Sequence, residues 1–187
     1  LMKTKQKRPT QLPTPLTSSK IQKLPYRKSF AVKELERLAF EEKKIKNPIT
    51  PVEWLAKPIY KDDNANGLTR CIIDFILLTG GQAERISNMG RYIDSRCTFN
   101  DVIGRSRTIG NAKWIKGTGT NGTADISATI KGLSVKVEVK YNRDRQSEAQ
   151  RAYQRQVEQA GGVYVIATSF EQFFTWYNNF IGGQNHE

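Results

Sequence analysis

The chain has 187 residues, of which 30 are Lys or Arg and 18 are Asp or Glu, so its formal net charge is +12. A chain of this length can bury a core, and we expect one domain with an appendage. So large a positive excess favours a polyanionic partner, because non-specific binding to nucleic acid is mainly the neutralisation of phosphates. The alternative is a basic protein without such a partner.

Several classes of protein are disfavoured by what the sequence lacks. Its two cysteines, Cys71 and Cys97, are too few for a disulfide framework and suit a reducing compartment. No apolar run approaches the ~18 residues of a transmembrane helix, and no apolar signal-peptide core lies near the N-terminus. The single histidine, His186, argues against His-dependent nucleases, Cys₂His₂ zinc sites and catalytic triads. We therefore expect a soluble, cytoplasmic protein whose chemistry comes from carboxylates and lysines.

Residues 1–28 contain eight Lys or Arg, no acidic residue and four of the seven prolines. Such a segment buries too little apolar surface to fold alone. We therefore expect a disordered basic arm over these residues. Two interpretations remain open for it: a non-specific grip on nucleic acid, and a solvated tail without a role.

Two helices are predicted before the first strands. Apolar residues at helical spacing predict one from about Ser29, its candidate N-cap, to residue 46. The other three prolines lie further on and predict a linker, with a short helix around Trp54. A nearly all-apolar run predicts a buried second helix over residues 67–79. These patterns divide the chain into the arm 1–28, an N-terminal helix and linker over 29–66, and a main domain over 67–182.

The most informative stretch is a predicted β-hairpin over residues 124–140. Two runs of alternating apolar and polar residues flank Lys131-Gly132, which is typical of a hairpin turn. With these two residues as the loop, Asp125 lies opposite Glu138, and Lys140 lies diagonal to Asp125 on the same face.

Two carboxylates opposed in this way are destabilising unless something compensates their repulsion. A divalent cation held between Asp125 and Glu138 would do so, since Mg²⁺ binds one or two carboxylates together with waters and phosphate oxygens. Lys140 could then orient a water molecule or stabilise developing negative charge. This pattern indicates a metal-dependent phosphodiesterase, and the alternative is a hairpin with ordinary charges on its solvated face.

The remaining elements predict a mixed α/β domain. A strand, a helix and a second strand over residues 134–166 favour a sheet covered by helices. Aromatic residues in the last helix are expected to pack in the core rather than to stack on bases. Further elements are expected as strands near 83–88, 91–95, 107–116 and 163–166, and as helices over 147–160 and from Ser169.

The segment from Gly117 to Gly122 matches the pattern G-x-G-x-x-G letter for letter. A dinucleotide site needs a helix after this pattern. Here a predicted strand follows, so we reject that interpretation. The glycines instead favour a loop that allows a phosphate or a neighbouring strand to approach closely.

From Trp114 to Gly162 the chain resembles the VRR-NUC branch of the PD-(D/E)xK nuclease superfamily. Two departures from its usual pattern concern Ala124, where members usually have Pro, and the first core helix. Many members carry a further acid on that helix, whereas this chain offers only Asp74, which leaves the completeness of a two-metal site open. The resemblance rests on Gly122-Thr-Ala-Asp125, Val137-Glu138-Val139-Lys140, Asp144-Arg145, Ser147-Glu-Ala-Gln150, Gly161-Gly162 and the apolar strand 163–166.

The resemblance implies a restriction-endonuclease-like α-β-β-β-α-β core with a mixed central sheet flanked by helices, within residues 67–182. It implies that Asp125, Glu138 and the backbone carbonyl of Val139 ligate Mg²⁺ or Mn²⁺, and that Lys140 positions or activates the attacking water. It gives Gln150 the role of supporting Lys140 or the scissile phosphate. The alternative for Gln150 is that it serves only as the capping-box partner of Ser147.

Members of this family act in replication, recombination and repair, often in phages, and usually cleave branched DNA. The resemblance therefore implies a deoxyribonuclease acting on double-stranded or branched DNA in a bacterial or phage-infected cell, and it allows a homodimer. The alternative is a catalytically inactive nuclease fold or a plain basic nucleic-acid-binding protein. The basic residues around the site, assigned together to phosphate contact, are Lys113, Lys116, Lys136, Arg143, Arg145, Arg151 and Arg155.

Overall fold

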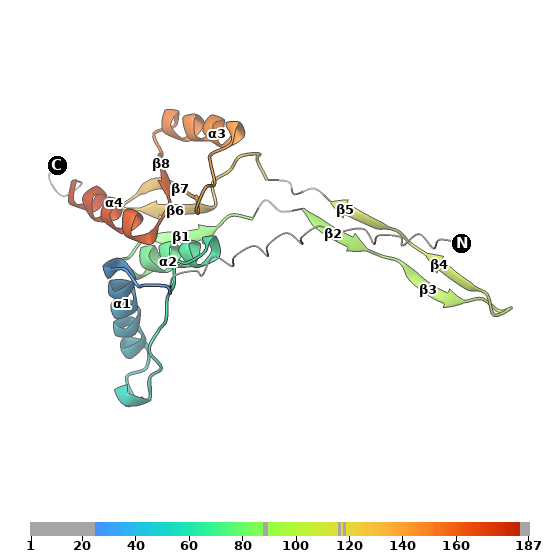
Figure 1. Ribbon diagram of the computed structural model, residues 1–187, viewed down its shortest axis with the longest axis horizontal. Helices are drawn as coiled ribbons and strands as arrows, with labels where there is room; N and C mark the ends of the chain where they lie inside the picture. The colour runs from blue at the N-terminus through green and yellow to red at the C-terminus, as the bar shows by residue number, and fades with distance from the viewer. Residues whose placement is uncertain (1–24, 88–89, 116, 118, 184–187) are drawn as a thin grey trace, which may run out of the picture.

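The computed structural model describes residues 25–87, 90–115, 117 and 119–183 of the chain (Figure 1). Most of the basic arm predicted over residues 1–28 therefore lies outside the described residues, as does Lys116.

The centre of the fold is a mixed four-stranded sheet in the order β1-β6-β7-β8. Strand β6 is antiparallel to both of its neighbours, β1 and β7, whereas β8 is parallel to β7 and is reached through helix α3. The predicted mixed α/β architecture, with a mixed sheet flanked by helices, is thus confirmed. The elements are β1 (Gln82–Arg85), β6 (Ile126–Ile130), β7 (Leu133–Val139), α3 (Glu148–Gln159) and β8 (Val163–Ala167).

The hairpin β6–β7 has the predicted register. Ile130 pairs with Leu133 across the turn, and Ile126 pairs with Val137 at the far end. The two loop residues both have positive φ, 50° at Lys131 and 81° at Gly132. A type I′ turn requires this combination, and its twist matches that of the flanking strands.

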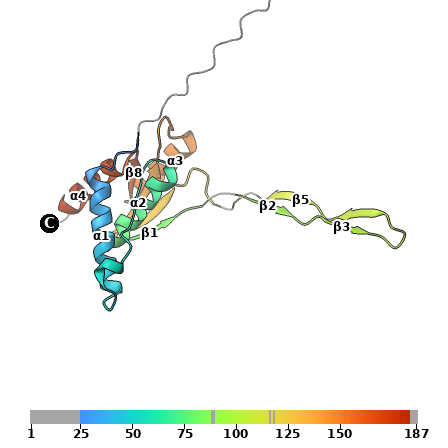
Figure 2. The ribbon, with the colours of Figure 1, turned by 60° about the horizontal axis from the view of Figure 1, so that its bottom comes forward.

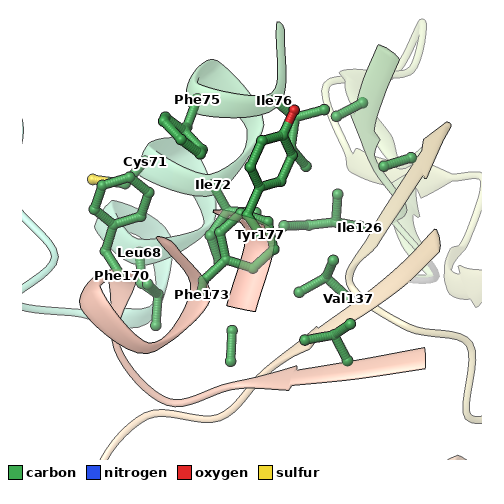
Figure 3. Close-up of a cluster of buried hydrophobic side chains, with 14 of the residues drawn as sticks. Leu68, Cys71, Ile72, Phe75, Ile76, Ile126, Val137, Phe170, Phe173 and Tyr177 are labelled. Atoms are coloured by element: carbon green, nitrogen blue, oxygen red, sulfur yellow. The ribbon is translucent and has the colours of Figure 1, made fainter. Parts of the chain in front are cut away.

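Helices α2 and α4 cover the apolar face of this sheet. Side chains from both helices meet sheet residues such as Ile126 and Val137 in one buried cluster (Figure 3). The aromatic residues of the last helix are therefore core residues, as predicted. The helices are α2 (Ala65–Leu78) and α4 (Phe170–Gly183), and their main core side chains are Leu68, Ile72, Phe75, Ile76, Phe170, Phe173 and Tyr177.

Helix α1 (Phe30–Lys46) packs into the same cluster through Ala31, Val32 and Leu35. Ser29 caps it as predicted, since its Oγ accepts a hydrogen bond from the Val32 amide. The short helix expected around Trp54 is η1 (Val52–Trp54). The N-terminal helix thus shares one core with the sheet.

Helix α3 lies against the other face of the sheet. Tyr153 of α3 packs edge-on against Tyr164 of β8, with ring centroids 6.3 Å apart. The α3 residue Gln150 also reaches Glu138 and Lys140 on β7's polar face. This face is therefore covered near the end of β7, although the sequence pattern alone suggests a solvated face.

The segment after β1 leaves the sheet and forms a long two-stranded ribbon. Figures 1 and 2 show it extending away from the helices and the central sheet. The single strand expected over residues 107–116 is in fact two strands separated at Gly110, whose φ is 86°. The pairs are β2 (Arg91–Asp94) with β5 (Ala112–Ile115), and β3 (Cys97–Asn100) with β4 (Ser106–Ile109).

The hairpin turn gives a first prediction. Lysine rarely adopts positive φ, whereas Asn does so more readily, so Lys131→Asn should raise the free energy of unfolding by up to about 1 kcal/mol. Lys131→Val should lower it, because a β-branched residue is strained in this region. Urea denaturation of both variants measures the difference, and equal stability of the two would contradict a left-handed residue 131.

Candidate active site

The predicted site residues meet at one end of the central sheet. Asp125 directly precedes β6, Glu138 lies in β7, and Lys140 follows β7. Gln150 lies in the first turn of α3, which the parallel β7–α3–β8 connection brings back over the sheet. The structure therefore brings these four side chains together.

Glu138 is the buried centre of the site, with 1% of its surface exposed. Its Oε1 accepts hydrogen bonds from the Lys140 ammonium at 2.9 Å and from the side-chain amide of Gln150. Its Oε2 accepts a longer one, 3.4 Å, from the Tyr164 hydroxyl. The carboxylate thus accepts hydrogen bonds from three side chains: Lys140, which follows β7, Gln150 of α3 and Tyr164 of β8.

Burial raises the pKa of Glu138, and the negative charge of Asp125 raises it further against the opposing hydrogen bond from Lys140. Burial and the charge of Asp125 therefore disfavour the ionised form of Glu138, and the hydrogen bond from Lys140 offsets them only in part. A divalent cation shared by Asp125 and Glu138 would stabilise that form, because nearby opposite charge favours the ionised form of a carboxyl.

The environment of Lys140 favours its protonated form. Burial alone would lower the pKa of Lys140, but the hydrogen bond to Glu138 and the attraction of Glu138 and Asp144 raise it above the ordinary value. An ammonium group cannot accept a proton. In this arrangement Lys140 can donate hydrogen bonds or stabilise negative charge, and it cannot act as a general base.

Asp125 supplies a carboxylate oxygen that is not bonded by any residue in the described part of the chain. Its Oδ2 accepts a hydrogen bond from the Val139 amide at 2.9 Å. Its Oδ1 has no hydrogen-bond partner among the residues that the structure describes. Asp125 is half-buried and lines a cavity of about 810 Å³, so this oxygen is the side-chain ligand most open to a cation or a phosphate.

Gln150 makes both of the contacts that the sequence left as alternatives. Its side-chain Oε1 accepts a hydrogen bond from the backbone amide of Ser147 at 2.8 Å. The Ser147 hydroxyl in turn accepts one from the backbone amide of Gln150, which completes a capping box. The same Oε1 accepts from Lys140 Nζ at 3.0 Å. The helix cap and the orientation of Lys140 therefore depend on one side chain.

The cavity beside Asp125 includes two residues that sequence reasoning missed, Asn66 and Arg85. Asn66 lies in the first turn of α2, and its Oδ1 accepts a hydrogen bond from Arg85 of β1 at 3.0 Å. The available signal was Asn64, which caps α2 and starts it at Ala65, ahead of the predicted residue 67. The full lining is Asn66, Arg85, Ile86, Ser87, Asn121, Gly122, Thr123, Ala124, Asp125, Ser147 and Gln150.

Asp74, the only acidic residue of α2, is engaged away from this cavity. Its carboxylate accepts a hydrogen bond from the Tyr60 hydroxyl at 2.8 Å and pairs with Arg70 at 3.5 Å. The α2 residue that lines the cavity is thus neutral. No group of three or more His, Cys, Asp or Glu placed to share a metal occurs among the described residues.

The candidate cation site therefore offers two carboxylates, with the Val139 carbonyl as the predicted backbone ligand. Such a set fits Mg²⁺, which binds through one or two carboxylates and completes its shell with waters and phosphate oxygens. It does not fit a structural zinc site, which requires four protein ligands.

The basic residues assigned to phosphate contact are spread over several elements. Lys136 precedes Glu138 on the same face of β7 and donates a 2.6 Å hydrogen bond to Ser127. Lys113 lies in the ribbon, on strand β5. Those exposed just after Lys140 or along α3 are Arg143, Arg145, Arg151 and Arg155.

A scan against models of known protein families finds no match, and a search among curated proteins finds none at a significant level. None of the helices in the described part of the chain is long and apolar enough to cross a membrane.

The loop before Asp125 is tied to α3 through Gly122. Its φ is 81°, in the left-handed region, and a Cβ added there would meet the Ala149 carbonyl and lie 2.8 Å from the Gln150 nitrogen. The backbone of this loop can therefore approach the first turn of α3 only without a side chain.

A second prediction follows for this contact. Gly122→Ala should lower the free energy of unfolding by about 2–4 kcal/mol, from roughly 1–2 for the left-handed backbone and the rest for the steric clash. Gly132→Ala is the matched control, because Gly132 also has φ 81° but nothing lies within 4 Å of its added Cβ. Equal losses in urea denaturation would show that the approach of the loop to α3 contributes nothing.

Proposed function

We propose that this protein is a metal-dependent deoxyribonuclease of the VRR-NUC type, with a restriction-endonuclease-like core. The observation that carries the proposal is the group formed by Asp125, Glu138, Lys140 and Gln150, of which Asp125 and Gln150 line a cavity. One carboxylate oxygen in this group is open, and a second acid beside it is held by a lysine and a glutamine. The chain's positive charge and the resemblance noted above support the same conclusion.

Asp125, Glu138 and the Val139 carbonyl would hold Mg²⁺ or Mn²⁺. When bound, such an ion supplies an acidified water and neutralises charge on the phosphate. Hydrolysis then needs no covalent intermediate with the protein. The cavity of about 810 Å³ beside Asp125 gives room for a phosphate and its flanking sugars.

The other polar residues have separate roles in this proposal. Protonated Lys140 orients the attacking water or stabilises charge that develops on the phosphate. Gln150 fixes the position of Lys140 through the hydrogen bond of 3.0 Å. Arg85, which lines the cavity, would contact a DNA phosphate. The expected substrate is double-stranded or branched DNA, in replication, recombination or repair.

One observation favours a second candidate, a nuclease fold that binds nucleic acid without cleaving it. The residue that α2 contributes to the cavity is the neutral Asn66, so the site has no third carboxylate from this helix. A site that binds one metal weakly, or none, would leave the basic surface with a binding role alone.

The third prediction separates these two candidates by cleavage. In Mg²⁺ or Mn²⁺ the protein should nick or cut branched or linear DNA, and EDTA should abolish the activity. Asp125→Asn, Glu138→Gln and Lys140→Met should each lower the rate by at least about 100-fold, the usual loss for a group that stabilises the transition state. Gel assays of labelled DNA measure the rates.

Glu171→Gln is the control for these substitutions, since Glu171 is an exposed carboxylate in the first turn of α4. It should cleave as the unaltered protein does. The proposal fails if the unaltered protein cleaves no DNA of the panel, or if Glu138→Gln and Lys140→Met keep its rate.

The fourth prediction concerns metal binding alone. A ligand that binds only the folded protein stabilises it by RT ln(1 + [L]/Kd), which is about 2.7 kcal/mol at a concentration of 100 Kd. Mn²⁺ should therefore raise the melting temperature of the unaltered protein and leave that of Asp125→Asn unchanged. In this variant the side-chain oxygen of residue 125 can still accept a hydrogen bond from the backbone amide of Val139, so we expect the fold to be preserved. An equal shift in both proteins would place the metal elsewhere.

A further inference from the structure

The ribbon, residues 91–115, lies in the chain between two segments that line the candidate active site. Ile86 and Ser87, which lead into it, and Asn121 and Gly122, which follow it, all line the cavity beside Asp125. The Ile86 amide also donates a hydrogen bond of 2.8 Å to the Asp125 carbonyl. A substrate held in the cavity would therefore contact the segments that lead into and out of the ribbon.

The ribbon carries uncompensated positive charge. Residues 91–115 contain five Lys or Arg and two Asp, a net charge of +3. Arg96 pairs with Asp94 at 2.7 Å, and Arg107 pairs with Asp101 at 2.9 Å. In the described part of the chain the side chains of the other three basic residues have no acidic partner; they are Arg91, Arg105 and Lys113.

Large apolar side chains are also exposed along the ribbon. Tyr92 and Trp114 oppose each other across β2 and β5, and 57% and 63% of their surfaces are exposed. Val102 and Ile103 are exposed at the tip between β3 and β4. Aromatic and aliphatic side chains of this kind contact bases and sugars in DNA complexes, and they also occur at protein interfaces.

The dimensions of the ribbon match those of duplex DNA. Its outward strands cover residues 91–100, which extend over about 33 Å at about 3.3 Å per residue. One turn of B-DNA rises about 34 Å, and its major groove of about 12 Å admits a two-stranded β-ribbon.

Charge decides between DNA and a second copy of the chain. Two ribbons of equal positive charge would repel each other, whereas DNA phosphates attract them. The segments on both sides of the ribbon line the cavity, which also favours a ligand that contacts both the cavity and the ribbon. We propose that the ribbon is a DNA-binding element that follows the duplex on one side of the scissile phosphate; this inference rests on the proposed nuclease function.

The fifth prediction tests the ribbon by DNA binding in EDTA, where the proposed hydrolysis cannot occur. Fluorescence anisotropy of a labelled duplex should show at least about tenfold weaker binding when Arg91, Arg105 and Lys113 are all replaced by Gln. The slope of log K against log salt should fall by about 2–3, because each phosphate contact contributes about 0.9. The control replaces three exposed lysines of the body by Gln (Lys33, Lys46 and Lys57) and should retain most of the affinity and slope.

Cys97 gives a second measurement at the ribbon itself. It is a free, exposed thiol in β3, whereas the other cysteine, Cys71, is buried. Burial raises the pKa of Cys71 to about 12, so this thiol reacts slowly with alkylating reagents. Duplex DNA should slow the alkylation of Cys97 several-fold in the unaltered protein, and it should do so less in the Gln variant of the ribbon.

Each outcome bears on one proposal. Equal loss of affinity in the ribbon and body variants, or alkylation of Cys97 unchanged by DNA, overturns the ribbon inference even if the protein cleaves DNA. Loss of binding only in the ribbon variant supports it, even if no cleavage is found in Mg²⁺ and the nuclease proposal fails. If Tyr92→Ser with Trp114→Ser turns a dimer into a monomer in sedimentation and leaves DNA affinity unchanged, the ribbon is instead an interface between copies.

Discussion

The site depends on the buried ion pair of Glu138 and Lys140, in which each charge compensates the other. Removing one partner of such a pair leaves an uncompensated charge and costs several kcal/mol. Gln150 completes the pair by donating to Glu138 and accepting from Lys140. The first turn of α3 must therefore lie over the end of β7, and the capping box at Ser147 and the close approach of Gly122 both hold it there.

Successive side chains of strand β7 point to opposite faces of the sheet, so one face of β7 packs in the core and the other carries the site residue Glu138. Val135 and Val137 are fully buried on the face covered by α2 and α4. Glu138 lies on the other face, where burial and Asp125 raise its pKa. A raised pKa means that the folded state binds the proton more tightly than the unfolded one, so ionised Glu138 lowers stability above that pKa. Burial of the apolar face offsets the free-energy cost of the ionised carboxylate, and a bound cation would lower that cost.

Local patterns in the sequence predicted those parts of the site that local geometry decides. The hairpin followed from two alternating runs and the Lys131-Gly132 turn, and the capping box followed from the spacing of Ser147 and Gln150. The burial of Glu138 was not predictable, because it depends on α3 crossing back over β7. The ribbon was missed as a unit because its strands have no buried face that would impose a pattern.

The sheet register also sets where the segment that leads toward the ribbon lies relative to Asp125. Strand β1 leads into the ribbon and pairs with β6, so Arg85 lies opposite Ile126, directly after Asp125. The hydrogen bond from Ile86 to the Asp125 carbonyl extends this pairing by one step. A slip of β1 by one residue would turn the side chain of Ala83 out of the core and move Ile86 away from the Asp125 carbonyl. The backbone pairing of β1 with β6, extended by Ile86, thus holds the segment that leads toward the ribbon beside Asp125.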